Sequence, residues 1–207
     1  MANTNHPFGL RLLGRQNDAT PSFQLGADPL KIASNNTTKI ARGDLLLRLN
    51  TGYVTAAVAA IADTAAAKSS IVGVFMGCEY LSNSLGRRTV APFWPGGDTS
   101  YDVDVQYIPL TGYPNARFVA QATSTAFAFT DIGQNVNIAY SAPTIYGSWA
   151  RSNLTLDQST LGTDVDLPFR IVGLWSQYAA PNQPGTDNDS SYNWAVVEFN
   201  GYNETGI

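Results

Sequence analysis

The chain has 207 residues, a length at which one large all-β domain can bury its own core without disulfide bridges. Only 14% of its residues are charged, against roughly 25% in ordinary soluble domains, while 44% are hydrophobic, which excludes an intrinsically disordered chain. Twelve basic residues against sixteen acidic ones give a net charge of −4, with no basic run longer than Arg87-Arg88. A protein that neutralises phosphates needs a basic stripe, so we expect no nucleic-acid partner.

Histidine and cysteine are too scarce for the commonest reactive sites. The single cysteine, Cys78, excludes an intrachain disulfide, and the single histidine, His6, excludes a zinc site built from His and Cys. A Ser-His-Asp triad would need His6, which lies near the start of the chain, and no Gly-x-Ser-x-Gly, Walker or Rossmann motif is present. We therefore expect a protein that is not an enzyme and that holds no cofactor or metal.

Neither a membrane span nor a secretory signal is indicated. The longest apolar stretch, residues 53–67, is interrupted by polar side chains and is too short to cross a bilayer. The first residues lack both a basic region and an apolar region. We expect a protein that is made and kept in solution, with no membrane partner.

Residues 1–30 have no sustained periodicity. They mix Gly, Pro and Asn with scattered apolar side chains such as Phe8 and Leu10. This composition is typical of an extended arm that docks on another surface, and a terminal loop packed on its own domain explains it equally well. We therefore divide the chain into an extended N-terminal arm over 1–30 and a β domain over 31–207.

Short strands are indicated from residue 32 onward. Gly43-Asp44 can form a turn that leads into a short β-strand over 45–49, and Asn50-Thr51-Gly52 then predicts a hairpin. Residues 55–68 are rich in alanine, which favours helix by propensity, but they lack helical amphipathicity. We expect a strand followed by a loop there.

The rest of the chain repeats the pattern of strand and turn. In the run 101–108 the side chains of Val103, Val105 and Tyr107 share one face, opposite the face of Asp102 and Asp104. No convincing 3.6-residue period occurs, so the sequence predicts a single all-β domain, either a β-sandwich with jelly-roll-like form or a barrel. The further strands expected are 71–77, 101–108, 117–129, 135–140, 169–178 and 192–199, and the turn clusters between strands are 94–98, 111–115 and 181–185.

Two weak signals for chemistry remain. Asp102 and Asp104 share a strand face, as Asp164 and Asp166 would in an extended segment, and paired carboxylates can hydrolyse glycosides when they face each other across a cleft. Carboxylates on the same face of one strand more often lie in solvent or contact a cation. Four tryptophans and ten tyrosines could form a sugar-stacking platform, for example at the loop 94–98, although such residues are more often core.

Several segments, read in order, resemble the small capsid decoration (cement) proteins of tailed bacteriophages. The start Asn5-His6-Pro7-Phe8-Gly9-Leu10-Arg11 is similar to their N-x-P-F-G-L/F-R opening, and Ile40-Ala41-Arg42-Gly43-Asp44-Leu45 to their I-x-x-G-D-V/L strand entry. Their Gly-x-Val hairpin has a counterpart in Gly52-Tyr53-Val54. The ordered set covers nearly the whole chain, least clearly over 101–166, and its other members are the segments 71–80, 169–174 and 194–200.

The resemblance implies a structural virion protein whose β-sandwich trimerises and clamps neighbouring major capsid subunits. We accordingly expect a homotrimer that is made in the host cytoplasm, binds the outer surface of the assembled capsid and stabilises it. An acidic, weakly charged chain suits an outer surface better than a DNA-lined interior. Within the arm, we expect Pro7, Phe8, Leu10 and Arg11 to contact the capsid or a neighbouring subunit. The alternative is a carbohydrate-binding β module of a phage fibre or receptor-binding protein.

Overall fold

The structure, a computed structural model, describes residues 3–15, 29–61, 64–110, 116–175 and 190–201. In these ranges the chain forms two six-stranded sheets and two two-stranded sheets, and every strand pair is antiparallel. Neither large sheet closes on itself within this part of the chain, so the barrel alternative is wrong for it. The architecture is mostly β and consistent with a β-sandwich.

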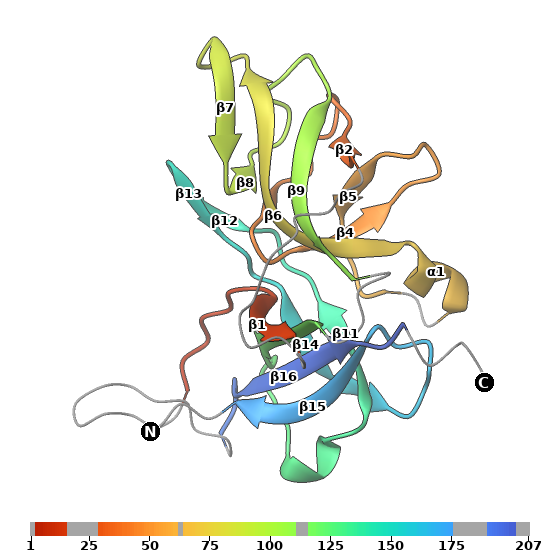
Figure 1. Ribbon diagram of the computed structural model, residues 1–207. Helices are drawn as coiled ribbons and strands as arrows, with labels where there is room; N and C mark the ends of the chain where they lie inside the picture. Colours follow the sequence, from red (N-terminus) through yellow and green to blue (C-terminus); the bar gives the residue numbers. More distant parts are fainter. Residues whose placement is uncertain (1–2, 16–28, 62–63, 111–115, 176–189, 202–207) are drawn as a thin grey trace.

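The lower sheet in Figure 1 combines the N-terminal strand with strands from the second half of the chain. The first strand of the chain pairs with the tenth, so the start of the chain forms one edge of a sheet made mostly from residues beyond 115. In spatial order the strands are β1 (Arg11–Arg15), β10 (Ala116–Gln121), β16 (Trp194–Phe199), β15 (Phe169–Trp175), β11 (Asn135–Ala139) and β14 (Thr155–Gly162).

The upper sheet is built on the longest strand, β6 (Ile71–Ser82), whose far end carries β7 (Arg87–Ala91). The path of the sheet is β2 (Lys31–Ile32), β9 (Val103–Pro109), β6, β4 (Leu45–Arg48) and β5 (Val54–Ala56). The two small sheets pair β3 (Ile40–Ala41) with β8 (Phe93–Trp94), and β12 (Thr144–Tyr146) with β13 (Trp149–Arg151).

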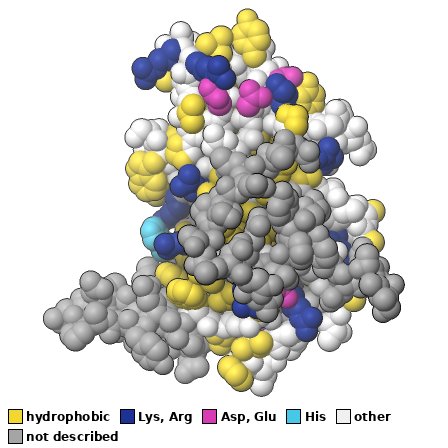
Figure 2. Space-filling view, in the orientation of Figure 1, with side chains coloured by type: hydrophobic (Ala, Val, Ile, Leu, Met, Phe, Trp, Pro, Cys, Tyr) yellow, Lys and Arg dark blue, Asp and Glu magenta, His cyan; other side chains and the backbone are white. Residues whose placement is uncertain are grey.

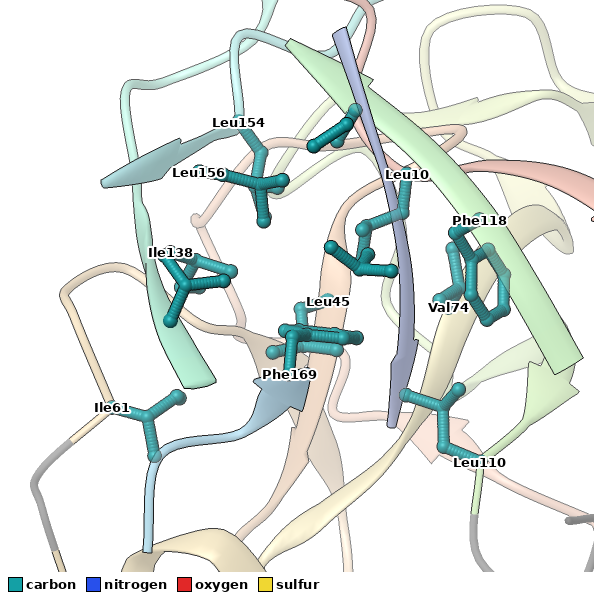
Figure 3. Close-up of a cluster of buried hydrophobic side chains, with 14 of the residues drawn as sticks. Leu10, Leu45, Ile61, Val74, Leu110, Phe118, Ile138, Leu154, Leu156 and Phe169 are labelled. Atoms are coloured by element: carbon teal, nitrogen blue, oxygen red, sulfur yellow. The ribbon is translucent and has the colours of Figure 1, made fainter. Parts of the chain in front are cut away.

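The upper sheet is buried on both faces where β4 and β6 cross the molecule. Leu45 and Val74 point into a hydrophobic cluster shared with Phe118 and Phe169 of the lower sheet (Figure 3). The next residues along each strand, Leu46 and Phe75, belong to a second cluster that includes Trp94 of β8. Successive side chains of a strand point to opposite faces, so one pair of strands contributes to both cores. This double burial explains the continuous apolar run of β6.

Most of the predicted strands are confirmed. The run 71–77 lies within β6, 101–108 overlaps β9, and 135–140 overlaps β11. On β9 the face of Val103 and Tyr107 is buried while Asp104 is exposed, as the alternation predicts. Residues 176–178 of the expected last-but-one strand and the turn clusters 111–115 and 181–185 lie outside the described residues.

The expected strand and loop over 55–68 is wrong in its second part, which contains the short helix α1 (Ala65–Ser69). The hydroxyl of Thr64 caps this helix by accepting a hydrogen bond from the backbone N–H of Ala67 at 3.2 Å. Five residues are too few to show a 3.6-residue period, whereas alanine propensity and a capping threonine suffice for one turn.

The expected strand 117–129 is too long. β10 ends at Gln121, and Phe129 begins the 3-10 turn η1 (Phe129–Asp131) with 80% of its surface exposed. Beyond the end of β10, the side chain of Asn193 bonds both the N–H and the C=O of Phe127, at 2.9 and 2.8 Å. These bonds take the place of strand pairing, and the spacing of aromatic residues along the chain could not reveal them.

Candidate functional site

The start of the chain is held against the lower sheet by one buried amide. Gln121, which is 1% exposed, accepts a hydrogen bond from the backbone N–H of His6 at 3.0 Å and donates to the C=O of Thr4 at 2.9 Å. Its amide also donates to the C=O of Tyr192 at 3.1 Å. A side-chain amide has both a donor and an acceptor, so it can pair with an extended backbone as a neighbouring strand would.

The four residues expected to make contacts occupy different environments. Leu10 is 2% exposed and belongs to the cluster between the two sheets, whereas Arg11 is exposed. Phe8 is half-buried and meets Trp194 edge to face, with ring centroids 4.9 Å apart. Pro7 is also half-buried, so Arg11 is the most accessible of the four.

Part of the predicted arm, residues 11–15, belongs to the β structure. Residues 11–15 form β1, in which Arg11 and Leu12 pair with Val119 and Phe118 of β10. Residues 16–28, most of the second half of the predicted arm, lie outside the described part of the chain. The role of residues 1–30 in binding stays a prediction.

A close backbone crossing fixes the first strand against the turn at residues 42–44. The backbone N–H of Leu10 donates to the C=O of Gly43 at 2.8 Å, and the N–H of Gly43 donates to Phe75 of β6 at 2.9 Å. Gly9 has a φ of +75°, and a Cβ atom on it would lie 2.5 Å from Oγ of Ser152. Glycine is therefore required at residue 9 both for its conformation and for the space it leaves.

The carboxylate of Asp44 is buried beneath this crossing. Its side chain accepts a hydrogen bond from the N–H of Ala41 at 2.7 Å and another from the hydroxyl of Ser152. Burial raises the pKa of Asp44 to about 6, although both hydrogen bonds act in the opposite direction. The residues Arg42-Gly43-Asp44 spell the tripeptide of adhesive proteins, which presents its carboxylate to a partner. Because the carboxylate of Asp44 is buried, these residues are here a structural turn.

A groove of about 490 Å³ lies beside the crossing, between β1, the turn, β6 and β13. Apolar side chains, among them Leu12, Met76 and Trp149, form much of its lining. Three guanidinium groups border it, those of Arg11, Arg42 and Arg151. In Figure 2, basic side chains and the histidine gather at the left margin beside hydrophobic side chains. This groove was not found from the sequence, because its arginines are scattered over 140 positions and show no local pattern.

The candidate carboxylates bond to their own surroundings. Asp102 accepts a hydrogen bond from the hydroxyl of Tyr53 at 2.9 Å, and Asp104 forms an ion pair with Lys31 at 3.1 Å. Asp164 accepts from the backbone N–H of Asp166 at 3.0 Å. These carboxylates lie at the surface and bond to neighbouring groups of the chain. They give no support to a pair of catalytic carboxylates that face each other across a cleft, as in a glycosidase.

The described ranges contain no group of three or more His, Cys, Asp or Glu side chains able to hold a metal ion. No helix within them is long and apolar enough to cross a membrane.

The aromatic residues that could bind a sugar include both core residues and residues of an exposed hairpin. Trp94, at the start of the loop proposed as a sugar platform, is fully buried. Tyr146 and Trp149 stack on each other at the tip of the β12–β13 hairpin, with centroids 4.1 Å apart and planes 16° apart. They are 42% and 51% exposed, so this hairpin presents a stacked aromatic pair to solvent beside the groove, while Tyr101 and Phe129 are exposed elsewhere.

Comparisons with known proteins give no match. No family model fits the chain, and no curated protein or solved structure is detectably similar to it.

Proposed function

We propose that this chain is a capsid decoration protein of a tailed bacteriophage, which binds the outer surface of the assembled capsid as a homotrimer and stabilises it. Each subunit would be a single β-sandwich of jelly-roll-like form. The partners under this proposal are the major capsid protein and further copies of the chain, and the protein would be neither an enzyme nor a nucleic-acid-binding or membrane protein.

The observation that carries the proposal is the meeting of the family-like segments in space. Leu10 of the first segment bonds to Gly43 of the second, and Gly43 bonds to Phe75 of the segment 71–80. Phe8 of the first segment packs on Trp194 of the last. Segments that are short and weak as separate motifs therefore form one connected framework, which supports reading them as a set rather than as chance strand and turn patterns.

Surface chemistry also supports the proposal. A protein retained on a shell by many weak attachments needs extensive contact surface rather than a reactive site. The exposed apolar side chains of β7, the helical turn η1 and the β12–β13 hairpin, namely Val90, Phe129, Tyr146 and Trp149, offer such surface.

The test uses the full chain and the assembled capsid of the phage that encodes it. We expect the protein to sediment with capsids at a fixed ratio to the major capsid protein and to raise the temperature at which they open. Light scattering of the free protein should give the mass of a trimer. No sedimentation with capsids would overturn the proposal. Deletion of residues 1–30 is a poor test, since it removes Leu10 from the core and β1 from the sheet.

The second candidate function, carbohydrate binding, is favoured by the exposed Tyr146–Trp149 pair. A glycan array that shows reproducible binding by the wild type, lost in Trp149→Ala, would support it. A decoration protein without a sugar site should bind no glycan.

A further inference from the structure

The groove lies between two strands that each have a free side. Within the described residues, β1 pairs with β10 alone and β13 pairs with β12 alone. Gly9, just before β1, lies against Ser152, just after β13, and the groove is lined by residues of both strands. An edge strand carries backbone N–H and C=O groups that an extended peptide can bind. The geometry therefore suits an elongated ligand.

The arginines at the groove have no ion-pair partner among the described residues. The ion pairs formed by the described residues lie elsewhere, at Lys31–Asp104, Lys68–Asp166 and Arg88–Glu79. Arg11, Arg42 and Arg151 pair with no carboxylate in these ranges, although the chain as a whole carries a net charge of −4. Three of twelve basic residues thus line one groove with no counter-charge in the described part of the chain, which favours an anionic ligand.

Arg151 has an unused hydrogen-bond donor. Its Nε atom is buried and has no hydrogen-bond partner among the described residues, while its Nη1 lies 3.1 Å from Nε2 of His6. A buried donor without a partner is unfavourable, and a carboxylate is the best acceptor for the planar guanidinium fork. Arg42 differs, because its Nε donates to the C=O of Met76 at 3.1 Å and leaves its terminal nitrogens for a ligand.

The apolar lining narrows the ligand class further. Leu12 and Met76 are half-buried in the groove, and Trp149 is 51% exposed beside it. A simple anion would leave these side chains uncovered. A neutral sugar could stack on the face of Trp149 that is not covered by Tyr146, but it would give the three arginines no counter-charge. A peptide can supply carboxylates, an apolar side chain and an extended backbone at once.

We propose that this groove binds an extended acidic segment of a partner protein, whose Asp or Glu side chains pair with Arg11, Arg42 and Arg151 and whose apolar side chain packs between Met76 and Trp149. The inference rests on the proposed function, under which the partner is the major capsid protein. It assigns the contact to one surface and one kind of ligand.

The first experiment compares two charge-reversed variants of the full chain in sedimentation with capsids. Arg11→Glu/Arg42→Glu changes the groove, while Arg48→Glu/Arg170→Glu makes the same change of charge at exposed residues outside it. We expect the groove variant to lose roughly tenfold or more in affinity and the control to bind as the wild type does, since close charge pairs strongly affect dissociation. Circular dichroism establishes that both variants are folded.

The outcomes separate the two proposals. If the wild type fails to bind capsids, the proposed function is wrong. If the wild type binds and the groove variant binds equally well, the function stands and the groove inference is overturned.

A cross-linking experiment identifies the ligand. Arg42→Lys places an amine at the groove, which a carbodiimide joins to a carboxylate that lies against it, and Arg48→Lys is the matched control. We expect mass spectrometry to find a new link between the introduced amine and an Asp- or Glu-containing peptide of the major capsid protein. A link to a second copy of this chain, or no link beyond those of the control, would overturn the proposal.

Discussion

The hydroxyl of Ser152 donates a hydrogen bond to the carboxylate of Asp44, 108 residues earlier in the sequence. The same hydroxyl accepts from the backbone N–H of Leu154 at 3.2 Å, so it joins the turn before β4 to the segment that leads into β14. The two large sheets are therefore tied together by a polar contact as well as by their shared hydrophobic cluster. Because the contact is buried, it should govern how stability depends on pH.

Asp44→Asn should abolish a specific pH dependence of stability. The pKa of Asp44 is raised by burial from 3.8 to about 6, so the folded protein holds this proton more tightly than the unfolded chain. Its contribution to the free energy of unfolding is therefore largest below about pH 4 and falls by on the order of 2–3 kcal/mol as the pH rises to about 7.

Urea unfolding at a series of pH values measures this effect as the difference between wild type and variant. Asp102→Asn, which removes an exposed carboxylate, is the control. A difference between wild type and Asp44→Asn that stays constant from about pH 4 to about pH 7 would contradict the prediction.

Gly9→Ala should destabilise the protein more than Gly52→Ala does. Both glycines have positive φ, +75° and +88°, so both substitutions incur a conformational cost of about 1 kcal/mol. A Cβ atom at residue 52 meets nothing within 4 Å, whereas at residue 9 it would lie 2.7 Å from the backbone oxygen of Gly43. We expect an additional loss of about 1–3 kcal/mol for Gly9→Ala in denaturant unfolding. Equal losses would show that the crossing can relax.

Asn193→Ala should remove about 1–3 kcal/mol of stability, because it leaves the buried backbone of Phe127 without its partners. Asn83→Ala is the matched control, since Asn83 is exposed and bonds to Ser100. We expect the control to change the free energy of unfolding by less than about 0.5 kcal/mol. Thermal or urea unfolding of the two variants gives the comparison, and similar values for both would refute the role of Asn193.

Cys78 should resist thiol reagents as long as the protein is folded. Its side chain is fully buried, its thiol contacts the C=O of Phe93, and burial raises its pKa to about 12. Since the thiolate is the reactive form, labelling with a disulfide reagent at mildly alkaline pH should be far slower for native protein than for protein in denaturant. Rapid labelling of the native protein would mean that the core around β6 opens readily.

Local pattern was sufficient for much of the β structure. The alternation of Val103 and Tyr107 with Asp104 identified β9 and its buried face, and the apolar run at 71–77 identified the centre of β6. Such signals are readable because the side-chain period of a strand involves only neighbouring residues. Local pattern failed where a distant residue decided the outcome, as at Phe127, whose backbone is held by Asn193.

The sequence by itself determined an all-β chain with little charge and few reactive side chains, since composition and period are properties of the chain alone. The tertiary structure decided that Asp44 is buried, that Gly9 must lack a side chain, and that Arg11, Arg42 and Arg151 share one groove. Each of these depends on residues about 30 to more than 100 positions apart, and their proximity follows from how the two sheets pack on a common core.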